Sequence, residues 1–268
     1  MRVIIFTTLL LFPVLLHAQY KKEVYTTASG YKLPYRILYP ENYDPQRSYP
    51  LVVFLHGVLE KGNDNEQQLA NGGALFLNEQ NRKNFPAIVI FPQCSVDSYW
   101  ASVDIDQNKL PIQITFHYEE PPTDAMNACI ELIGKFTKEK KADKKKVYIL
   151  GLSMGGMGTL EAISRYPELF AAAVPICGAG DTSYCHRYAG RTALWLFHGE
   201  EDKGMDPEQS RVIVNKLRSL GDFVKYTEYP GVGHNSWDKA LAEPELLPWL
   251  FRQKIRKKVF SNWFVARK

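Results

Sequence analysis

A serine flanked by glycines occupies the most informative stretch of the chain. Ser153 lies in the pattern G-L-S-M-G at residues 151–155, which follows a short apolar run and leads directly into a helical pattern. Glycine on both sides allows a turn too tight for a Cβ. Such a strand, turn and helix lifts the hydroxyl clear of the backbone, beside the positive end of the helix. We interpret Ser153 as a nucleophile; the alternative is an ordinary glycine-rich loop.

A serine nucleophile needs a base to take its proton, and the base needs a group that orients it. Of the six histidines, His234 lies in the glycine-rich segment P-G-V-G-H-N-S-W at residues 230–237, directly after the last predicted strand. The glycines allow this loop to fold back over the strand edge toward Ser153. We therefore predict that His234 is the base; the alternative is a surface histidine.

Three carboxylates are candidates for the orienting acid. The predicted strand at residues 192–197 runs into H-G-E-E-D, which places Glu200, Glu201 and Asp202 next to one another. A short side chain holds an imidazole more rigidly than a long one, which favours Asp202, with the two glutamates as alternatives. The order Ser153, Asp202, His234 along the chain is the order of α/β hydrolases.

The elements that must position these residues alternate between strand and helix. A β-hairpin is predicted over residues 22–39. Buried strands are predicted at residues 49–55, 87–91, 147–150, 170–176 and 192–197, and a further strand at 224–229. Helices are predicted from residue 123 or 124 to 136, after Ser153, and at 207–220 and 243–253. This alternation predicts an α/β fold with a mostly parallel sheet, helices on both faces, and chemistry at the carboxyl ends of the strands. Residues 94–122 are predicted to form a long loop, and 138–146 a lysine-rich turn.

The ends of the chain differ from its middle. Arg2 precedes a largely apolar run and then His17-Ala18, which is typical of a secretory signal peptide over residues 1–18. We predict one catalytic domain at residues 19–254, a basic tail at 255–268, and a periplasmic or secreted protein. No integral membrane segment is expected after signal removal. The formal charge of +4 is spread along the 268 residues, so nucleic acid is not expected as a partner.

The four cysteines do not form a recognisable framework. Cys94, Cys129, Cys177 and Cys185 are scattered through the chain, without a C-x-x-C pair. Cys129 lies in a helical pattern and is interpreted as a buried apolar residue, whereas Cys177 and Cys185 are candidates for closing a short loop. The sequence therefore predicts neither a metal site nor a cofactor.

Several motifs together carry a family resemblance. L-H-G-V-L-E-K-G-N-D-N, F-P-Q-C, G-L-S-M-G-G, V-P-I-C-G-A-G-D, F-H-G-E-E-D and G-V-G-H-N-S-W, spread over about residues 33–253, resemble those of secreted α/β-hydrolase serine esterases. These comprise prolyl-oligopeptidase-like, phospholipase/carboxylesterase-like, polyhydroxybutyrate depolymerase-like and feruloyl-esterase-like enzymes. The resemblance implies the α/β-hydrolase fold, Asp202 as the acid, and an oxyanion hole formed by the backbone N–H groups of Val58 and Met154. Leu59 departs from the usual H-G-x-G pattern.

Together these features predict an exported serine esterase that works through an acyl-enzyme. The connection at residues 177–191 is only fifteen residues long, too short for a lid domain. An open cleft favours short-chain or aromatic acyl groups, on small molecules or on a polysaccharide. Tyr99, Trp100 and Trp237 are candidate pocket walls; the alternative is that they pack under the long loop. A serine peptidase of prolyl-oligopeptidase-like type and a catalytically silent binding protein are the rival functions.

Overall fold

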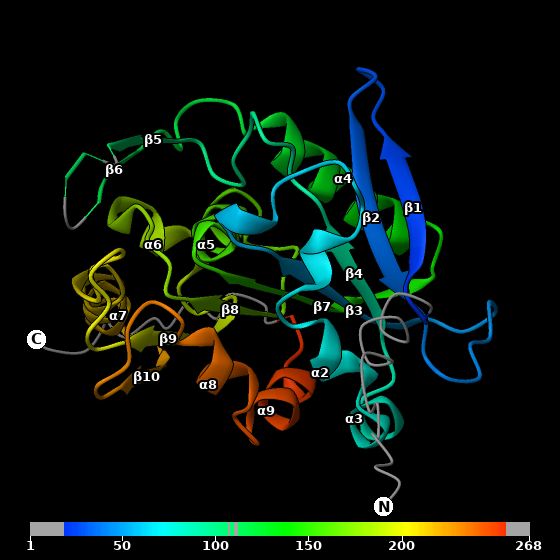
Figure 1. The fold of residues 1–268 in the computed structure, drawn as a ribbon. Coiled ribbons are helices and arrows are strands. Elements are labelled where there is room, and N and C mark those ends of the chain that lie inside the picture. The colour runs from blue at the N-terminus through cyan, green and yellow to red at the C-terminus, as the bar shows by residue number, and fades with distance from the viewer. Residues whose placement is uncertain (1–18, 107, 110–111, 256–268) are drawn as a thin grey trace, which may run out of the picture.

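The protein is described by a computed structural model over residues 19–106, 108–109 and 112–255. The predicted signal peptide and residues 256–268 of the predicted tail lie outside this part of the chain. Within it, an eight-stranded sheet has the order β1-β2-β4-β3-β7-β8-β9-β10, and β5 and β6 form a separate pair (Figure 1). The strands are β1 (Lys21–Thr26), β2 (Lys32–Leu38), β3 (Tyr49–Leu55), β4 (Ile88–Pro92), β5 (Val103–Asp106), β6 (Gln113–Phe116), β7 (Ala142–Leu152), β8 (Ala172–Ile176), β9 (Ala193–Gly199) and β10 (Lys225–Tyr229).

The predicted mostly parallel sheet is confirmed. β1 and β2 form the predicted hairpin and β2 pairs antiparallel with β4, whereas every pairing from β4 through β10 is parallel. Parallel strands end at the same edge of a sheet. The segments that follow β3, β7, β9 and β10 are therefore gathered at one edge.

Helices cover both faces of the sheet (Figure 1). One face carries α4 (Asp124–Lys138), α5 (Met154–Arg165), α6 (Cys185–Tyr188) and α7 (Glu208–Ser219). The other face carries α2 (Gly73–Leu77), α3 (Glu79–Asn84), α8 (Trp237–Leu241) and α9 (Leu246–Arg252). Short 3₁₀ turns are η1 (Val58–Glu60), η2 (Gln67–Leu69) and η3 (Thr182–Tyr184). The predicted start of α4 is confirmed, because Thr123 caps it by accepting from the Met126 N–H.

Two hydrophobic cores explain why the central strands are continuous apolar runs. In β3, Leu51, Val53 and Leu55 belong to the core under α4 and α5. Val52 and Phe54 belong to the core under α2 and α9. Successive side chains of a strand point to opposite faces, so a strand covered on both sides must be apolar at every position. The length of the apolar run therefore identifies a central strand.

Two segments that were predicted as loop or turn contain strands. Residues 94–122 are not a plain loop, because β5 and β6 pair antiparallel within them. Each of these strands has only four residues, and neither is fully buried. The alternation of apolar and polar residues that would predict a strand is therefore weak. The lysine-rich segment is also not wholly a turn, because β7 begins at Ala142, where it pairs with Tyr49 of β3. Lys144 and Lys145 lie exposed on the first part of that strand.

All four cysteines are buried and unpaired. Cys177 and Cys185 therefore do not close a disulfide loop, whereas Cys129 is a buried core residue of α4, as predicted. Burial raises the pKa of the Cys94 and Cys129 thiols to about 12.

None of the helices in the described part of the chain has both the length and the hydropathy needed to cross a bilayer.

The glycines around Ser153 are required by close backbone contacts. A Cβ on Gly155 would stand 2.0 Å from the Leu55 carbonyl oxygen, and one on Gly151 would stand 2.2 Å from the Gly155 carbonyl oxygen. Both positions are closed by backbone, which cannot move aside as a flexible side chain can.

We expect Gly155→Ala to destabilise the protein by about 3 kcal/mol or more, because α5 would have to shift away from β3. Gly134→Ala, within α4, is the matched control, since nothing lies within 4 Å of the added Cβ. That change should stabilise the helix by about 0.5–1 kcal/mol. Thermal and urea unfolding of the two variants measure both effects. Equal stability of Gly155→Ala and the unmodified protein would contradict the close approach of α5 and β3.

Candidate active site

Ser153 occupies a strained turn between β7 and α5. Its φ of 53° and ψ of −116° are unusual for a residue with a side chain, and such a conformation costs about 1–3 kcal/mol. The backbone is held there by the Ser153 N–H, which donates to the Ile176 carbonyl of β8 at 2.9 Å. The side chain is left partly exposed, at the amino end of α5. This is the strand, turn and helix arrangement that the sequence predicts.

The structure brings together three residues that are distant in sequence. His234 Nε2 lies 2.9 Å from Ser153 Oγ, and His234 Nδ1 lies 2.6 Å from Asp202 Oδ2. The second distance requires Nδ1 to carry a proton, since an ionised carboxylate only accepts. Nε2 is then free to accept the serine proton. The three side chains form a hydrogen-bonded relay that ends at the serine hydroxyl.

Asp202 is the carboxylate that meets His234. It follows β9, and its other oxygen, Oδ1, accepts from the backbone N–H groups of Gly204 at 3.0 Å and Met205 at 2.9 Å. Glu200 instead accepts from the Gly231 N–H at 3.2 Å, which links the acid loop to the histidine loop. Glu201 is exposed, and its backbone N–H donates to Val232. Among the three candidates, only Asp202 has the geometry of an orienting acid.

Asp202 is held in its ionised form. Burial opposes ionisation, but hydrogen bonds from His198 and His234, together with the backbone donors, outweigh it and hold the pKa of Asp202 well below its usual range. The carboxylate side chain is fully buried, whereas that of His234 is 38% exposed. A fixed negative charge therefore lies behind an imidazole that faces the cleft.

The two predicted oxyanion donors stand at the beginnings of short and long helices that follow neighbouring strands. Met154 is the first residue of α5 and Val58 the first residue of η1, so neither N–H has an acceptor within its own helix. β3 lies beside β7 in the sheet, with Leu55 opposite Gly151, which carries the Val58 segment toward Ser153. Leu59, the departure from the family pattern, is 85% exposed and does not fill the turn.

His56 supports this segment. Its Nδ1 lies 2.6 Å from the Gly57 carbonyl, and its Nε2 lies 2.9 Å from the backbone N of Cys94. Since the carbonyl can only accept and the N–H can only donate, the ring carries its proton on Nδ1. Burial lowers the pKa of His56 to about 4. The neutral His56 ring therefore connects the turn at Gly57 to the segment after β4 through two hydrogen bonds.

The three aromatic candidates fall in different places. Trp100 has no exposed surface, donates its indole N–H to the His56 carbonyl at 3.2 Å, and packs against Gly158 of α5. Its interpretation as a pocket wall is therefore wrong, because the segment after Cys94 turns inward. Tyr99 is partly exposed, with Lys61 Nζ 4.3 Å above its ring. Trp237 is partly exposed. Its ring lies edge-on to the His234 ring, with 5.4 Å between the ring centroids.

A buried ion pair that the sequence interpretation missed fixes the β5–β6 insertion to the serine helix. The fully buried Glu161 carboxylate accepts from the Ser102 N–H at 2.6 Å and from Arg165 Nε at 2.6 Å. Arg165 also reaches the His117 carbonyl at 3.4 Å. Glu161 and Arg165 are four residues apart on the predicted helix, and this spacing is the signal that could have revealed the pair.

Two groups in the described chain bring possible metal ligands within 4.8 Å of one another. One consists of Cys177, Asp202 and His234, and it coincides with the relay, where Asp202 and His234 already hold hydrogen-bond partners. The other consists of His117, Glu119 and Glu120. Both nitrogens of the His117 ring already face carboxylates, at 2.9 Å for Asp104 and 3.6 Å for Glu119. In both groups the histidine nitrogens thus already have polar partners within the protein.

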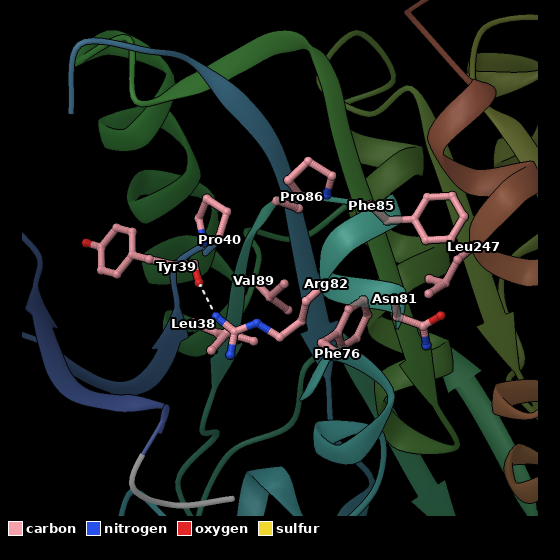
Figure 2. A pocket seen from close by; sticks show the side chains of 11 residues that line it. Leu38, Tyr39, Pro40, Phe76, Asn81, Arg82, Phe85, Pro86, Val89 and Leu247 are labelled. Carbon is pink, nitrogen blue, oxygen red and sulfur yellow. Dashed lines mark hydrogen bonds between the residues drawn. The ribbon is translucent and has the colours of Figure 1, made fainter. Parts of the chain in front are cut away.

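Figure 2 shows a small cavity whose lining contains none of the relay residues. Its volume is about 20 Å³, enough for one water molecule. Arg82 crosses it and donates to the Tyr39 carbonyl at 3.2 Å. The lining includes Leu38, Phe76, Phe85, Ala87 and Leu247. Ala87 precedes the parallel strand β4, so this cavity is at the amino edge of the sheet, opposite the edge that carries Ser153.

Comparison with known proteins agrees with the geometry. The model of the Esterase family matches residues 26–252, which is most of the chain. The protein belongs to the Esterase family. It is a serine carboxylic-ester hydrolase with the α/β-hydrolase fold.

Individual relatives of this esterase differ in how much they share with it. The crystal structure of a thermostable esterase is 37% identical with a TM-score of 0.81, and the match covers 90% of the chain but only 64% of that structure. Carboxylesterase SOBER1 from Arabidopsis thaliana is 23% identical over 75% of this chain and 90% of its own length. A ferulic acid esterase from Anaeromyces mucronatus, in complex with ferulic acid, is 15% identical with a TM-score of 0.64 over 85% of this chain and 89% of its own. The last likeness concerns the fold.

Proposed function

We propose that the protein is an exported serine esterase that cleaves short-chain or aromatic carboxylic esters through an acyl-enzyme formed on Ser153. The observation that carries the proposal is the relay, with 2.9 Å between Ser153 Oγ and His234 Nε2 and 2.6 Å between His234 Nδ1 and Asp202 Oδ2. These distances are those of a nucleophile and its oriented base. Export rests on the signal-peptide pattern at residues 1–18.

In the first half of the reaction, Ser153 Oγ attacks the ester carbonyl while His234 Nε2 takes its proton. Asp202 stabilises the imidazolium that forms. The tetrahedral oxyanion is received by the N–H groups of Val58 and Met154, and two such donors contribute several kcal/mol to lowering the barrier. His234 then gives its proton to the leaving alcohol, and the acyl group stays on Ser153.

In the second half, water replaces the alcohol. His234 takes a proton from the water, and the water oxygen attacks the acyl carbon. The bond between that carbon and Ser153 Oγ then breaks, His234 returns the proton to Oγ, and the carboxylic acid leaves. The 38% exposure of the His234 side chain leaves a path for this water. The same groups therefore serve both halves, with the proton movements reversed.

The substrate class that we propose follows from the small size of the segments that could cover the relay. The connection between β8 and β9 holds only η3 and α6, and α6 packs against α5. The β5–β6 insertion is fixed to α5 through Glu161 and Arg165. Neither element forms a separate lid domain. An open cleft buries little of a long acyl chain, and an exposed methylene contributes only a fraction of about 0.8 kcal/mol. The aromatic esters in the proposal are also in line with the ferulic acid esterase of similar fold, which was solved in complex with ferulic acid.

We therefore expect kcat/KM to be highest for acetate to butyrate and for methyl ferulate, and to fall for acyl chains beyond about eight carbons. A p-nitrophenyl ester series from acetate to palmitate, with methyl ferulate alongside, measures this preference. Prolyl-p-nitroanilide is the control for peptidase activity and should be cleaved far more slowly. A preference that rises with chain length, or that jumps above the micellar concentration, would contradict the open cleft.

A further inference from the structure

A second histidine contacts the carboxylate of the relay. His198, on β9, has no exposed surface. Its Nε2 lies 3.3 Å from Asp202 Oδ2 and 2.9 Å from the Met205 carbonyl, and its Nδ1 lies 2.7 Å from Ser210 Oγ. Asp202 Oδ2 is the oxygen that also meets His234. Two imidazoles therefore converge on one carboxylate oxygen.

The partners of His198 fix where its proton lies. The Met205 carbonyl can only accept, so Nε2 must carry the proton. That N–H donates to the Met205 carbonyl, and Asp202 Oδ2 lies 3.3 Å from the same nitrogen. Nδ1 is then satisfied by the hydroxyl of Ser210. The tautomer is the reverse of the one at His56, where Nδ1 carries the proton.

These contacts form a closed network around residues 200–205, the loop that carries Asp202. Asp202 Oδ1 accepts from the Gly204 and Met205 N–H groups, and the Met205 carbonyl returns to His198 at the base of the loop. Ser210 adds α7 to the network, because its hydroxyl lies 2.7 Å from His198 Nδ1. His198 thus links the loop that carries Asp202 to β9 and to α7.

We propose that His198 is a positioning residue for ester hydrolysis, which acts through Asp202 by fixing its carboxylate and by sharing the oxygen that accepts from His234. The proposal rests on the proposed function, since it assigns Asp202 as the orienting acid. His198 itself does not touch the serine or the ester.

The shared oxygen has a consequence for the pH dependence. Each donor on Asp202 reduces the charge available to stabilise the His234 imidazolium. Loss of the His198 donor should therefore stabilise the imidazolium, so that a higher pH is needed to free the base.

Other ionisable groups around His198 come from the neighbouring elements. Glu228 lies opposite it on β10, where Arg211 of α7 pairs with the carboxylate at 2.6 Å and holds the pKa of Glu228 below its usual value. Cys177, at the end of β8, lies within 4.8 Å of Asp202 and His234 ligand atoms. Burial keeps this thiol neutral by raising its pKa. These groups are unchanged in the variants below.

Two substitutions of similar polarity distinguish the contacts of His198 Nε2 from those of His198 Nδ1. The amide nitrogen of His198→Gln can reach the position of Nε2 and keep a donor to Asp202. The shorter His198→Asn reaches only the position of Nδ1 and keeps a partner for Ser210. We expect the glutamine variant to resemble the unmodified enzyme. The asparagine variant should lose about 10- to 100-fold in kcat with little change in KM, and the midpoint of its acid limb should move up by about half a pH unit.

The measurement is the full pH profile of kcat and kcat/KM for p-nitrophenyl acetate, together with the Tm of each variant. Leu132→Ala, in the core under α4, is the control for lost stability and should lower Tm without moving the acid limb. Identical acid limbs for the asparagine and glutamine variants would overturn the proposal. Activity that survives Ser153→Ala would instead overturn the proposed function, so the two failures are distinct.

A measurement on the unmodified protein does not depend on the folding of a variant. ¹⁵N NMR of the histidine-labelled enzyme should show His198 with its proton on Nε2 throughout the pH range of activity. A proton on Nδ1 with Nε2 unprotonated would remove the donor to Asp202 and overturn the proposal.

Discussion

Ser153→Ala is expected to lower kcat for p-nitrophenyl acetate by about four to six orders of magnitude, with the fold unchanged. The hydroxyl is partly exposed, and its side-chain partner is His234 Nε2, so its loss removes the nucleophile and little packing. Alanine keeps the Cβ that the strained turn already holds, so the backbone should not relax. Stopped-flow and steady-state assays measure the loss, and circular dichroism with thermal unfolding tests the fold.

Ser164→Ala is a matched control for this change. Ser164 lies on the same helix, is buried, and donates to the Leu160 carbonyl at 2.7 Å, far along α5 from the relay. It should keep its activity. A fluorophosphonate should modify the unmodified enzyme and Ser164→Ala on the peptide that contains Ser153, and should leave Ser153→Ala unmodified. Ester turnover by Ser153→Ala at a normal rate would show that another group is the nucleophile.

Asp202→Asn is expected to have the second largest effect, a loss of about 10⁴-fold in kcat. An asparagine can donate where the carboxylate accepts, which allows the wrong tautomer of His234, and it cannot stabilise the imidazolium. The two donors from the Gly204 and Met205 backbone can still be accepted by the amide oxygen, so the loop should stay in place. The steady-state kcat of the purified variant measures the effect.

The neighbouring glutamates provide the comparison. Glu201→Gln changes an exposed side chain and should leave kcat within about twofold of the unmodified enzyme, as is usual for surface changes. Glu200→Gln keeps an acceptor for the Gly231 N–H, so its effect should also be small. If Glu201→Gln were the most damaging of the three changes, the orienting acid would have to be reassigned.

Much of the fold was predictable because its central strands have a simple physical signature. β3 is buried on both faces and therefore reads as an unbroken apolar run, and its predicted bounds agree with the structure. The turn at Ser153 was predictable for a related reason, since the contacts around Gly151 and Gly155 exclude any larger residue. In both cases the residue type at each position is limited by the space and burial at that position.

Features that depend on side-chain direction were not predictable in the same way. Trp100 and Trp237 are both tryptophans in predicted loops, yet one faces the core and the other lies beside His234. The choice among three adjacent carboxylates likewise depends on which one the loop turns inward. The contact between His198 and Asp202 arises from the path of the whole acid loop, which no local pattern records.

The burial of the thiols has a practical consequence for handling the protein. Cys94, Cys129, Cys177 and Cys185 are all buried and unpaired, so production under reducing conditions does not break a bond that the fold uses. Thiols of this kind react slowly with maleimides, because the reagent attacks the thiolate and needs access to it. A single cysteine introduced at an exposed position such as Asn108, in the β5–β6 connection, should therefore take up a fluorophore selectively. A dye placed there would report the position of the hairpin during turnover without removal of any native cysteine.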